Sequence, residues 1–204
     1  MSGGWGAAAG ELLRGGLVIY PTETFYALGC LATLHAAAER IFEVKGRPGG
    51  KPLPLIIADW DMAGRYLRLR ATEMALARAF WPGPLSIVTE VDPSVSPLAR
   101  DVRGRSAVRM SPHPIATGLC LAAGAPLVSS SANLSGGVAV SRPGDLDPEL
   151  LRRSDAMVLD AMPWPAGGLP STLVEVADGR PRILRPGALT ASAIAGKGFD
   201  VLVE

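Results

Sequence analysis

Short apolar runs alternate with amphipathic stretches along most of the chain. The apolar runs are rich in branched aliphatic side chains and end at Gly, Pro or Ser, which is typical of buried strands. The expected strands are residues 17–20, 53–57, 85–91, 107–110, 126–129, 157–159 and 171–176. The stretches between them carry apolar residues at helical spacing, which predicts helices. The expected helices are residues 7–14, 33–44, 59–69, 72–81 and 113–123, with a helical turn over 147–153.

Two local signals refine this pattern. Pro54 lies inside the second expected strand and has no N–H, so we expect that strand at a sheet edge or at a bulge. Asp178-Gly179 separates the last expected strand from residues 182–184 and predicts a hairpin turn. Alternating strands and helices followed by a late hairpin predict an α/β fold, in which helices pack against a mixed sheet.

The composition favours one globular domain. Of the 204 residues, 48% are hydrophobic and 19% are charged, which suits a sizeable core and argues against disorder. The net charge of +1 gives no overall field that would attract nucleic acid, although it leaves a local basic groove open. Residues 1–10 lack the pattern of a signal peptide, and no apolar run is long enough to span a membrane. We therefore expect a cytoplasmic protein.

Cysteine and histidine show no metal-site pattern. Cys30 and Cys120 form no C-x-x-C pair, so we interpret them as small buried residues, with a disulfide or a catalytic thiol as the alternative. His35 and His113 are too few and too far apart for a metal centre, and His113 suits the start of a helix better than a general base. We expect no metal ion with direct protein ligands.

The distribution of lysine is unusual. The chain has three lysines and seventeen arginines, and Lys45 and Lys51 lie in one loop beside Arg47. Glycines in this loop let the backbone approach a ligand, while Lys supplies a point charge and Arg a two-pronged donor, which suits a polyphosphate. A solvated basic turn is the alternative. The chain has no Walker A or G-x-G-x-x-G motif, so a nucleotide would bind through a different loop.

Three further segments place polar side chains at expected strand ends. They are residues 20–29 with Thr24, residues 106–109 with Ser106 and Arg109, and residues 129–136 with Ser129, Ser131 and Asn133. Consecutive serines are not expected in a core, and their hydroxyls and amides suit a phosphate or carboxylate; an N-cap cluster is the alternative. Arg109 is either an anion clamp or a solvent-facing strand residue. Because ligands of open α/β sheets bind outside strand ends, we expect the four segments to meet at one site.

Seven short motifs then occur in order along most of the chain. They are Pro21-Thr22-Glu23-Thr24 with Tyr26 and Gly29, Lys45-x-Arg47-Pro48, Trp81-Pro82-Gly83-Pro84, Ala107-Val108-Arg109 with His113-Pro114, the segment 129–136, Ser171-Thr172, and Leu184-Arg185-Pro186-Gly187. In this order and spacing, from about residue 11 to residue 190, the chain resembles the YrdC-like family, the threonylcarbamoyl-adenylate synthases. The resemblance implies a single YrdC-like domain over residues 1–204, with a twisted mixed β-sheet, flanking helices and a central cleft.

The resemblance implies an enzyme, a nucleotidyltransferase. Its substrates would be L-threonine, bicarbonate and ATP, and its products threonylcarbamoyl-adenylate and pyrophosphate. A downstream threonylcarbamoyl transferase complex would use the adenylate to form N6-threonylcarbamoyladenosine in tRNA. Mg²⁺ would arrive with ATP.

The resemblance also implies residue roles. The expected catalytic residues, which would hold the triphosphate, are Lys45, Arg47 and Lys51. The residues expected to contact ATP are Arg47, Lys51, Ser106, Ser131, Asn133 and Arg185. The residues expected to contact threonine are Thr24, Arg109, Ser129 and Ser171, with Arg109 pairing the carboxylate.

Some features depart from the family pattern. Some relatives have a His in the strand that here reads 53–57 without one, and some have Asn in place of Lys51. Longer relatives carry an additional C-terminal domain, so we expect this chain to be a single-domain form. The alternatives are a module that binds double-stranded RNA or tRNA, a carbamoyl-transfer domain, and a catalytically inactive copy of the enzyme. The low net charge argues against the first, and the retained Lys45, Arg47, Arg109 and Asn133 argue against the last.

Overall fold

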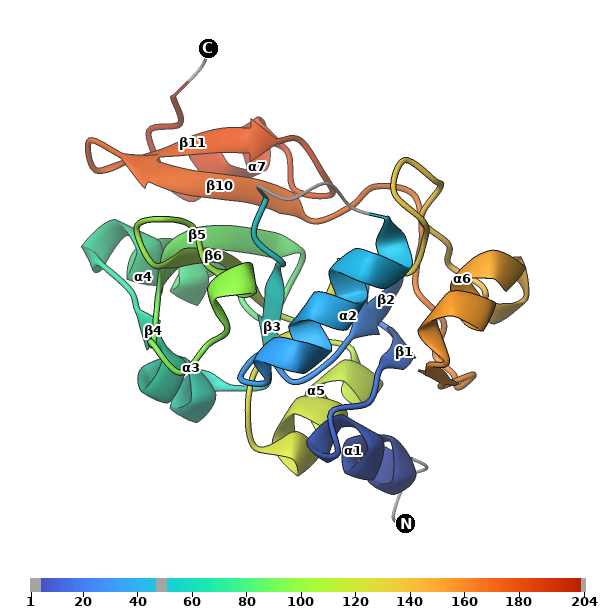
Figure 1. The fold of residues 1–204 in the computed structure, drawn as a ribbon. Helices are drawn as coiled ribbons and strands as arrows, with labels where there is room; N and C mark the ends of the chain where they lie inside the picture. Colours follow the sequence, from blue (N-terminus) through green and yellow to red (C-terminus); the bar gives the residue numbers. More distant parts are fainter. Residues whose placement is uncertain (1–4, 47–50, 203–204) are drawn as a thin grey trace.

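Two β-sheets form the centre of the structure (Figure 1). At Ser129 the chain passes from the larger sheet to the smaller one. The computed structural model describes residues 5–46 and 51–202, so the predicted site residue Arg47 lies outside the described residues. The smaller sheet has the strand order β8-β2-β1-β9, and the larger one the order β11-β10-β5-β6-β3-β7 with β4 paired to β5.

The smaller sheet is built around a buried hairpin. Its strands are β1 (Val18–Pro21), β2 (Tyr26–Gly29), β8 (Ser130–Ser131) and β9 (Met157–Val158). β1 pairs antiparallel with β2 and parallel with β9, and every residue of the hairpin strands is buried. The sequence pattern did not predict β2, because this short apolar run directly follows the polar residues of the first motif.

The larger sheet is mixed, as predicted. Its strands are β3 (Leu55–Ile57), β4 (Leu67–Arg68), β5 (Leu85–Val91), β6 (Arg105–Met110), β7 (Leu127–Val128), β10 (Thr172–Ala177) and β11 (Arg180–Arg185). The pairs β3–β6 and β5–β10 are parallel, whereas β5–β6, β3–β7, β4–β5 and β10–β11 are antiparallel. The predicted hairpin is present, and both of its turn residues have positive φ, 51° for Asp178 and 75° for Gly179.

Helices flank both sheets. They are α1 (Trp5–Leu13), α2 (His35–Lys45), α3 (Trp60–Tyr66), α4 (Ala71–Phe80), α5 (Pro114–Ala123), α6 (Pro148–Ser154) and α7 (Ala191–Ala195). α5 contacts both β1 and β3 and so packs across the junction of the sheets, with α1 against it; the β10–β11 hairpin and α7 lie at the opposite end (Figure 1). Among residues 5–46 and 51–202, no helix combines the length and the hydropathy that a membrane crossing requires.

The prediction that Pro54 places its strand at a sheet edge is wrong. Pro54 precedes β3, and β3 lies between β6 and β7. The proline contributes its carbonyl oxygen, which accepts a hydrogen bond from the Ser129 N–H at 2.8 Å. Its missing N–H therefore removes no bond from the sheet.

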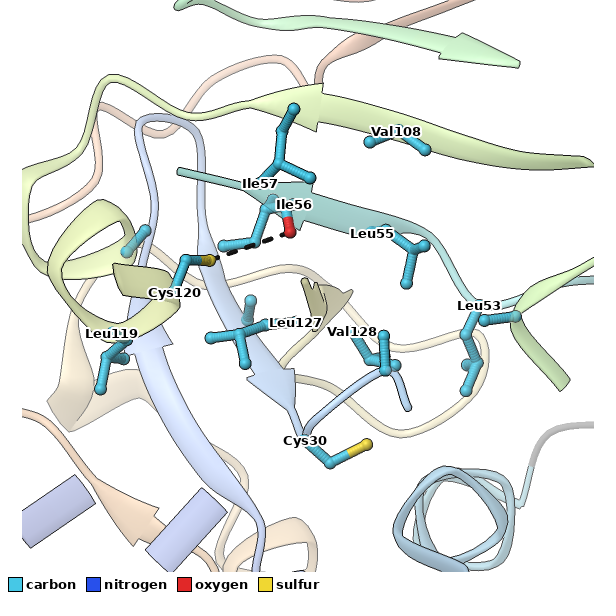
Figure 2. Close-up of a cluster of buried hydrophobic side chains, with 14 of the residues drawn as sticks. Cys30, Leu53, Leu55, Ile56, Ile57, Val108, Leu119, Cys120, Leu127 and Val128 are labelled. Atoms are coloured by element: carbon cyan, nitrogen blue, oxygen red, sulfur yellow. Dashed lines mark hydrogen bonds between the residues drawn. The ribbon is translucent and has the colours of Figure 1, made fainter. Parts of the chain in front are cut away.

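The two cysteines are part of the aliphatic core (Figure 2). Both are free and buried, which confirms the interpretation as small core residues. Sγ of Cys120 lies 3.8 Å from the carbonyl oxygen of Ile56, against which it packs (Figure 2).

We expect neither thiol to react with dithionitrobenzoate at about pH 8 while the protein is folded, and both to react in guanidinium chloride. Burial raises the pKa of each thiol from 9.0 to about 12, so little thiolate forms and the reagent has no access. Because the folded state binds these protons more tightly than the unfolded state, stability should also fall as the pH rises from about 9 towards 12. Rapid labelling of the native protein would contradict this prediction.

Gly29→Ala is expected to destabilise the fold by about 1–3 kcal/mol. A Cβ at Gly29 would lie 2.2 Å from the carbonyl oxygen of Val128 and 2.7 Å from Cε1 of Tyr20. These atoms are fixed relative to each other, because the Tyr20 hydroxyl donates to the same carbonyl at 2.9 Å. Urea unfolding would measure the loss. Gly64→Ala is the control, because a Cβ there has nothing within 4 Å, and an equal loss in both variants would contradict the steric argument.

Candidate functional site

The predicted polar segments meet at the junction of the two sheets. The turn 22–25 follows β1, Arg109 lies near the end of β6, and Ser129 links β7 to β8. Ser171 directly precedes β10, and Arg185 is the last residue of β11.

Arg109 forms an ion pair with a carboxylate of its own chain. Its Nε lies 2.8 Å from Oε1 of Glu23, and only 8% of the Arg109 side chain and 13% of the Glu23 side chain are exposed. The other carboxylate oxygen of Glu23 accepts a hydrogen bond from the hydroxyl of Ser111. The alternative interpretation of Arg109 as a solvent-facing strand residue is therefore wrong.

The turn that carries Glu23 is held from two sides. Within the turn, the hydroxyl oxygens of Thr22 and Thr24 lie 3.4 Å apart, and both residues are buried. From outside, the N–H of Gly167 donates to the carbonyl oxygen of Thr24 at 2.9 Å, and that of Ala166 donates to the carbonyl oxygen of Glu23 at 3.3 Å. The predicted threonine-site residue Thr24 is thus fixed beside the Arg109 ion pair.

Ser171 and Arg185 contact each other. Nη2 of Arg185 donates to the carbonyl oxygen of Ser171 at 2.7 Å and to its hydroxyl at 3.1 Å. The Ser171 hydroxyl also lies 2.9 Å from that of Ser86. Partial burial and, second, the charge of Arg109 lower the pKa of Arg185. Two guanidinium groups whose charges affect one another, with one carboxylate paired to Arg109, suit an additional anionic group.

The serine run is largely buried, contrary to the sequence prediction. Ser129 and Ser130 are buried, because Ser130 pairs with Leu28 across β8 and β2, whereas Ser131 is exposed. The buried hydroxyl of Ser129 makes no well-aligned hydrogen bond to the described residues, although it is near enough to the Tyr20 hydroxyl to oppose slightly the rise that burial causes in the pKa of Tyr20. Such a group is costly, and a ligand or a water molecule usually completes it.

Lys45 holds the loop that follows these serines. It is the last residue of α2, it is buried, and α2 ends at Gly46, whose φ of 57° reverses the chain. Nζ of Lys45 donates to the carbonyl oxygen of Asn133 at 2.6 Å and also to that of Ser131. The side-chain amide of Asn133 closes the loop by donating to the carbonyl oxygen of Gly137 at 2.6 Å. In this arrangement Lys45 and Asn133 position the loop.

Ser106 and Lys51 lie along another part of the junction. Ser106 and Arg109 are three residues apart on β6, so their side chains point to opposite faces of the sheet. The hydroxyl of Ser106 is buried and donates to the carbonyl oxygen of Leu53 at 3.3 Å. Lys51, two residues before Leu53, is exposed. Ser106 therefore supports the segment around Leu53, which leads from Lys51 into β3.

Glu23 was not among the predicted site residues, although it belongs to the first of the seven motifs. A carboxylate between two threonines that follow a buried strand was a usable signal, because a buried carboxylate requires a cation. His113 was correctly predicted at a helix start, since its side chain accepts from the N–H of Ile115 at the start of α5. Its Nε2 lies 2.8 Å from the carbonyl oxygen of Pro163, and burial lowers its pKa.

A cavity over α3 and α4 is separate from the predicted site residues. Its volume is about 650 Å³, and its lining, which includes Trp60, Met74 and Arg78, contains none of them. Within the described ranges, no group of three or more His, Cys, Asp or Glu side chains is placed to hold a metal ion.

The chain is similar in sequence and in fold to several known proteins. The Sua5/YciO/YrdC family model, described as telomere recombination, matches residues 11–187. A threonylcarbamoyl-AMP synthase of Stenotrophomonas maltophilia is 37% identical over 155 residues, which cover 74% of this chain and 83% of that protein. A Mycobacterium tuberculosis relative is 35% identical over 196 residues, 93% of this chain and 86% of the relative. The crystal structure of P. abyssi Sua5 complexed with L-threonine superimposes with a TM-score of 0.87 at 31% identity, over 97% of this chain and 58% of that one.

Proposed function

The chain belongs to the Sua5/YciO/YrdC family, and from this premise we propose that it is a threonylcarbamoyl-adenylate synthase. This nucleotidyltransferase joins L-threonine, bicarbonate and ATP and releases pyrophosphate. The observation that carries the proposal is Arg109, a buried guanidinium near the end of β6 that is ion-paired with Glu23 and whose charge contributes to lowering the pKa of Arg185. Thr24, Ser129 and Ser171, the other residues of the predicted threonine site, are buried as well. The related P. abyssi Sua5 was crystallised with L-threonine.

Threonine is the substrate that suits the buried half of the site. Its α-carboxylate would pair with Arg109, because an arginine fork matches a carboxylate in geometry and charge. The buried hydroxyl of Ser129 and the hydroxyls of Thr24 and Ser171 would recognise its polar groups. A site that leaves buried polar groups unpaired when the substrate hydroxyl is missing discriminates strongly against analogues.

ATP would bind on the side of the basic loop. Lys51 is exposed and lies in the segment that leads into β3, and Arg47, four positions earlier in the sequence, is outside the described residues. The loop 131–133, held by Lys45, would line the nucleotide together with Arg185 and the segment that Ser106 supports. Mg²⁺ would enter with ATP as part of the substrate.

The reaction needs positioning more than acid–base chemistry. The threonine amine takes up bicarbonate to form a carbamate, with loss of water. A carbamate oxygen then attacks the α-phosphorus of ATP, and pyrophosphate leaves. Negative charge accumulates on phosphate oxygens, so fixed cations supply most of the stabilisation that the protein can provide. The adenylate would pass to a threonylcarbamoyl transferase complex acting on tRNA.

Pyrophosphate release tests the proposal. The purified protein is incubated with ATP, Mg²⁺ and bicarbonate, with L-threonine, with serine, or without an amino acid. Release that depends on threonine and exceeds that with serine supports the synthase. Protein that binds ATP but releases no pyrophosphate with either amino acid would contradict the proposal and favour an inactive copy or a protein that binds RNA.

A further inference from the structure

We propose that Glu23 is a positioning residue for threonine recognition, which acts by fixing the orientation of Arg109. The inference rests on the proposed synthase function and adds a role for a residue that would not itself bind the substrate. It concerns which edge of the Arg109 guanidinium is available to the threonine carboxylate.

The contact geometry identifies the edge that Glu23 occupies. Oε1 of Glu23 lies 2.8 Å from Nε of Arg109. A guanidinium can receive a carboxylate along the edge that contains Nε or along the edge formed by Nη1 and Nη2. Because Glu23 contacts Nε, the Nη1–Nη2 edge is the one left for the α-carboxylate of threonine.

The contact is mainly one between charges. Neither Oε1 of Glu23 nor Nε of Arg109 has an aligned hydrogen bond to any described residue, although the two atoms are close and buried. Charge attraction in a partly dry environment depends little on angle, so the pairing holds without ideal hydrogen-bond geometry. An uncharged side chain of the same shape, such as glutamine, should therefore lose most of the attraction that holds Arg109 in place.

Glu23 is held firmly enough to position another residue. Its second carboxylate oxygen accepts a hydrogen bond from Ser111, and its backbone carbonyl accepts one from Ala166 at 3.3 Å. The next carbonyl, that of Thr24, accepts one from Gly167 at 2.9 Å. These contacts come from two separate segments of the chain, residue 111 and residues 166–167, so the carboxylate keeps its place when the ligand changes.

The charges near Arg109 explain why such a device is needed. Arg185 is close enough for the charge of Arg109 to contribute to the lowering of its pKa. Two like charges repel, and without a fixed anion Arg109 would turn away from Arg185. Glu23 holds Arg109 in place and leaves a net positive charge for the substrate.

The test is Glu23→Gln, with KM for threonine and for ATP measured separately in the pyrophosphate assay. We expect KM for threonine to rise about tenfold or more, because the Arg109 edge is no longer aligned, and KM for ATP to stay within about twofold. Calorimetric titration with threonine should show the same loss. Glu149→Gln is the control, since Glu149 is paired with Arg152 and Arg153 on the surface of α6 and should leave both constants unchanged.

The direction in which threonine affinity changes distinguishes a positioning role of Glu23 from a general effect of its negative charge. Loss of one negative charge near two arginines would by itself strengthen anion binding, so tighter threonine binding in Glu23→Gln would overturn the proposal. In an Arg109→Lys background, which has no Nε edge, Glu23→Gln should change KM for threonine by less than about twofold. An equal rise in KM for threonine in the wild-type and the Arg109→Lys backgrounds would also overturn the proposal.

Two controls separate folding and function from this inference. Melting temperatures establish that the variants are folded, and Glu23→Asp, which keeps the charge on a shorter side chain, should retain more threonine affinity than Glu23→Gln. If Glu23→Gln does not fold, Glu23→Asp provides the test, because its shorter side chain withdraws the carboxylate from Nε of Arg109: a raised KM for threonine supports the proposal and a wild-type KM contradicts it. A wild-type protein without threonine-dependent release would contradict the proposed function, whereas an active wild type with unchanged KM in Glu23→Gln would contradict this inference alone.

Discussion

Arg109→Ala is expected to reduce kcat/KM for threonine by at least about 100-fold in the pyrophosphate assay, which would make it one of the most damaging single substitutions in the site. The variant removes the guanidinium that we assign to the threonine carboxylate. It also leaves the carboxylate of Glu23 buried without its cation, because the two side chains are only 8% and 13% exposed. We therefore expect a stability loss of about 3 kcal/mol as well.

The two effects of this substitution can be separated. ATP binding, measured by calorimetry below the melting temperature of the variant, should survive in the folded protein. Arg78→Ala is a matched control, since Arg78 is exposed and lies 5.6 Å from the centre of the Trp60 ring, away from the site. Wild-type threonine kinetics in folded Arg109→Ala would contradict the assignment of the carboxylate to this residue.

Lys45→Met is expected to raise KM for ATP about tenfold or more and to lower stability by about 2 kcal/mol or more. The reason is that Lys45 is buried and its Nζ donates to the carbonyl oxygens of Ser131 and Asn133, so its loss would release the loop that it holds. Met is unbranched and fills much of the space of the lysine side chain, but it has no charge and no donor. Urea unfolding and ATP titration measure the two effects.

Lys51→Met provides the contrast. Lys51 is exposed, so we expect its loss to leave stability unchanged and to affect only the binding and turnover of ATP. If Lys45→Met is as stable as Lys51→Met and differs from wild type only in turnover, the positioning role of Lys45 would be wrong, and a direct contact with the triphosphate would explain it better.

Much of the architecture followed from local patterns. Residues 85–91 form a strand with the predicted bounds because an aliphatic run after a Pro-Gly-Pro turn has few other stable conformations. Asp178-Gly179 specified its hairpin because both residues tolerate positive φ. Where the patterns failed, tertiary pairing outweighed propensity. Leu67 and Arg68 leave the expected helix to pair with β5, and β2 forms because β1 and β8 offer partners on both sides.

The residue types of the site could be predicted from the sequence alone. The order of the seven motifs was also enough to predict the family. Such motifs are short and consist of neighbouring residues, so they can be identified in a sequence whose fold is not known. Only the tertiary structure decided which partners these residues have: that Glu23 pairs with Arg109 across 86 positions, that Lys45 supports a loop, and that Ser129 and Ser130 are buried. Ion pairs and burial depend on distance in space, and residues far apart in sequence acquire that distance only when the two sheets meet.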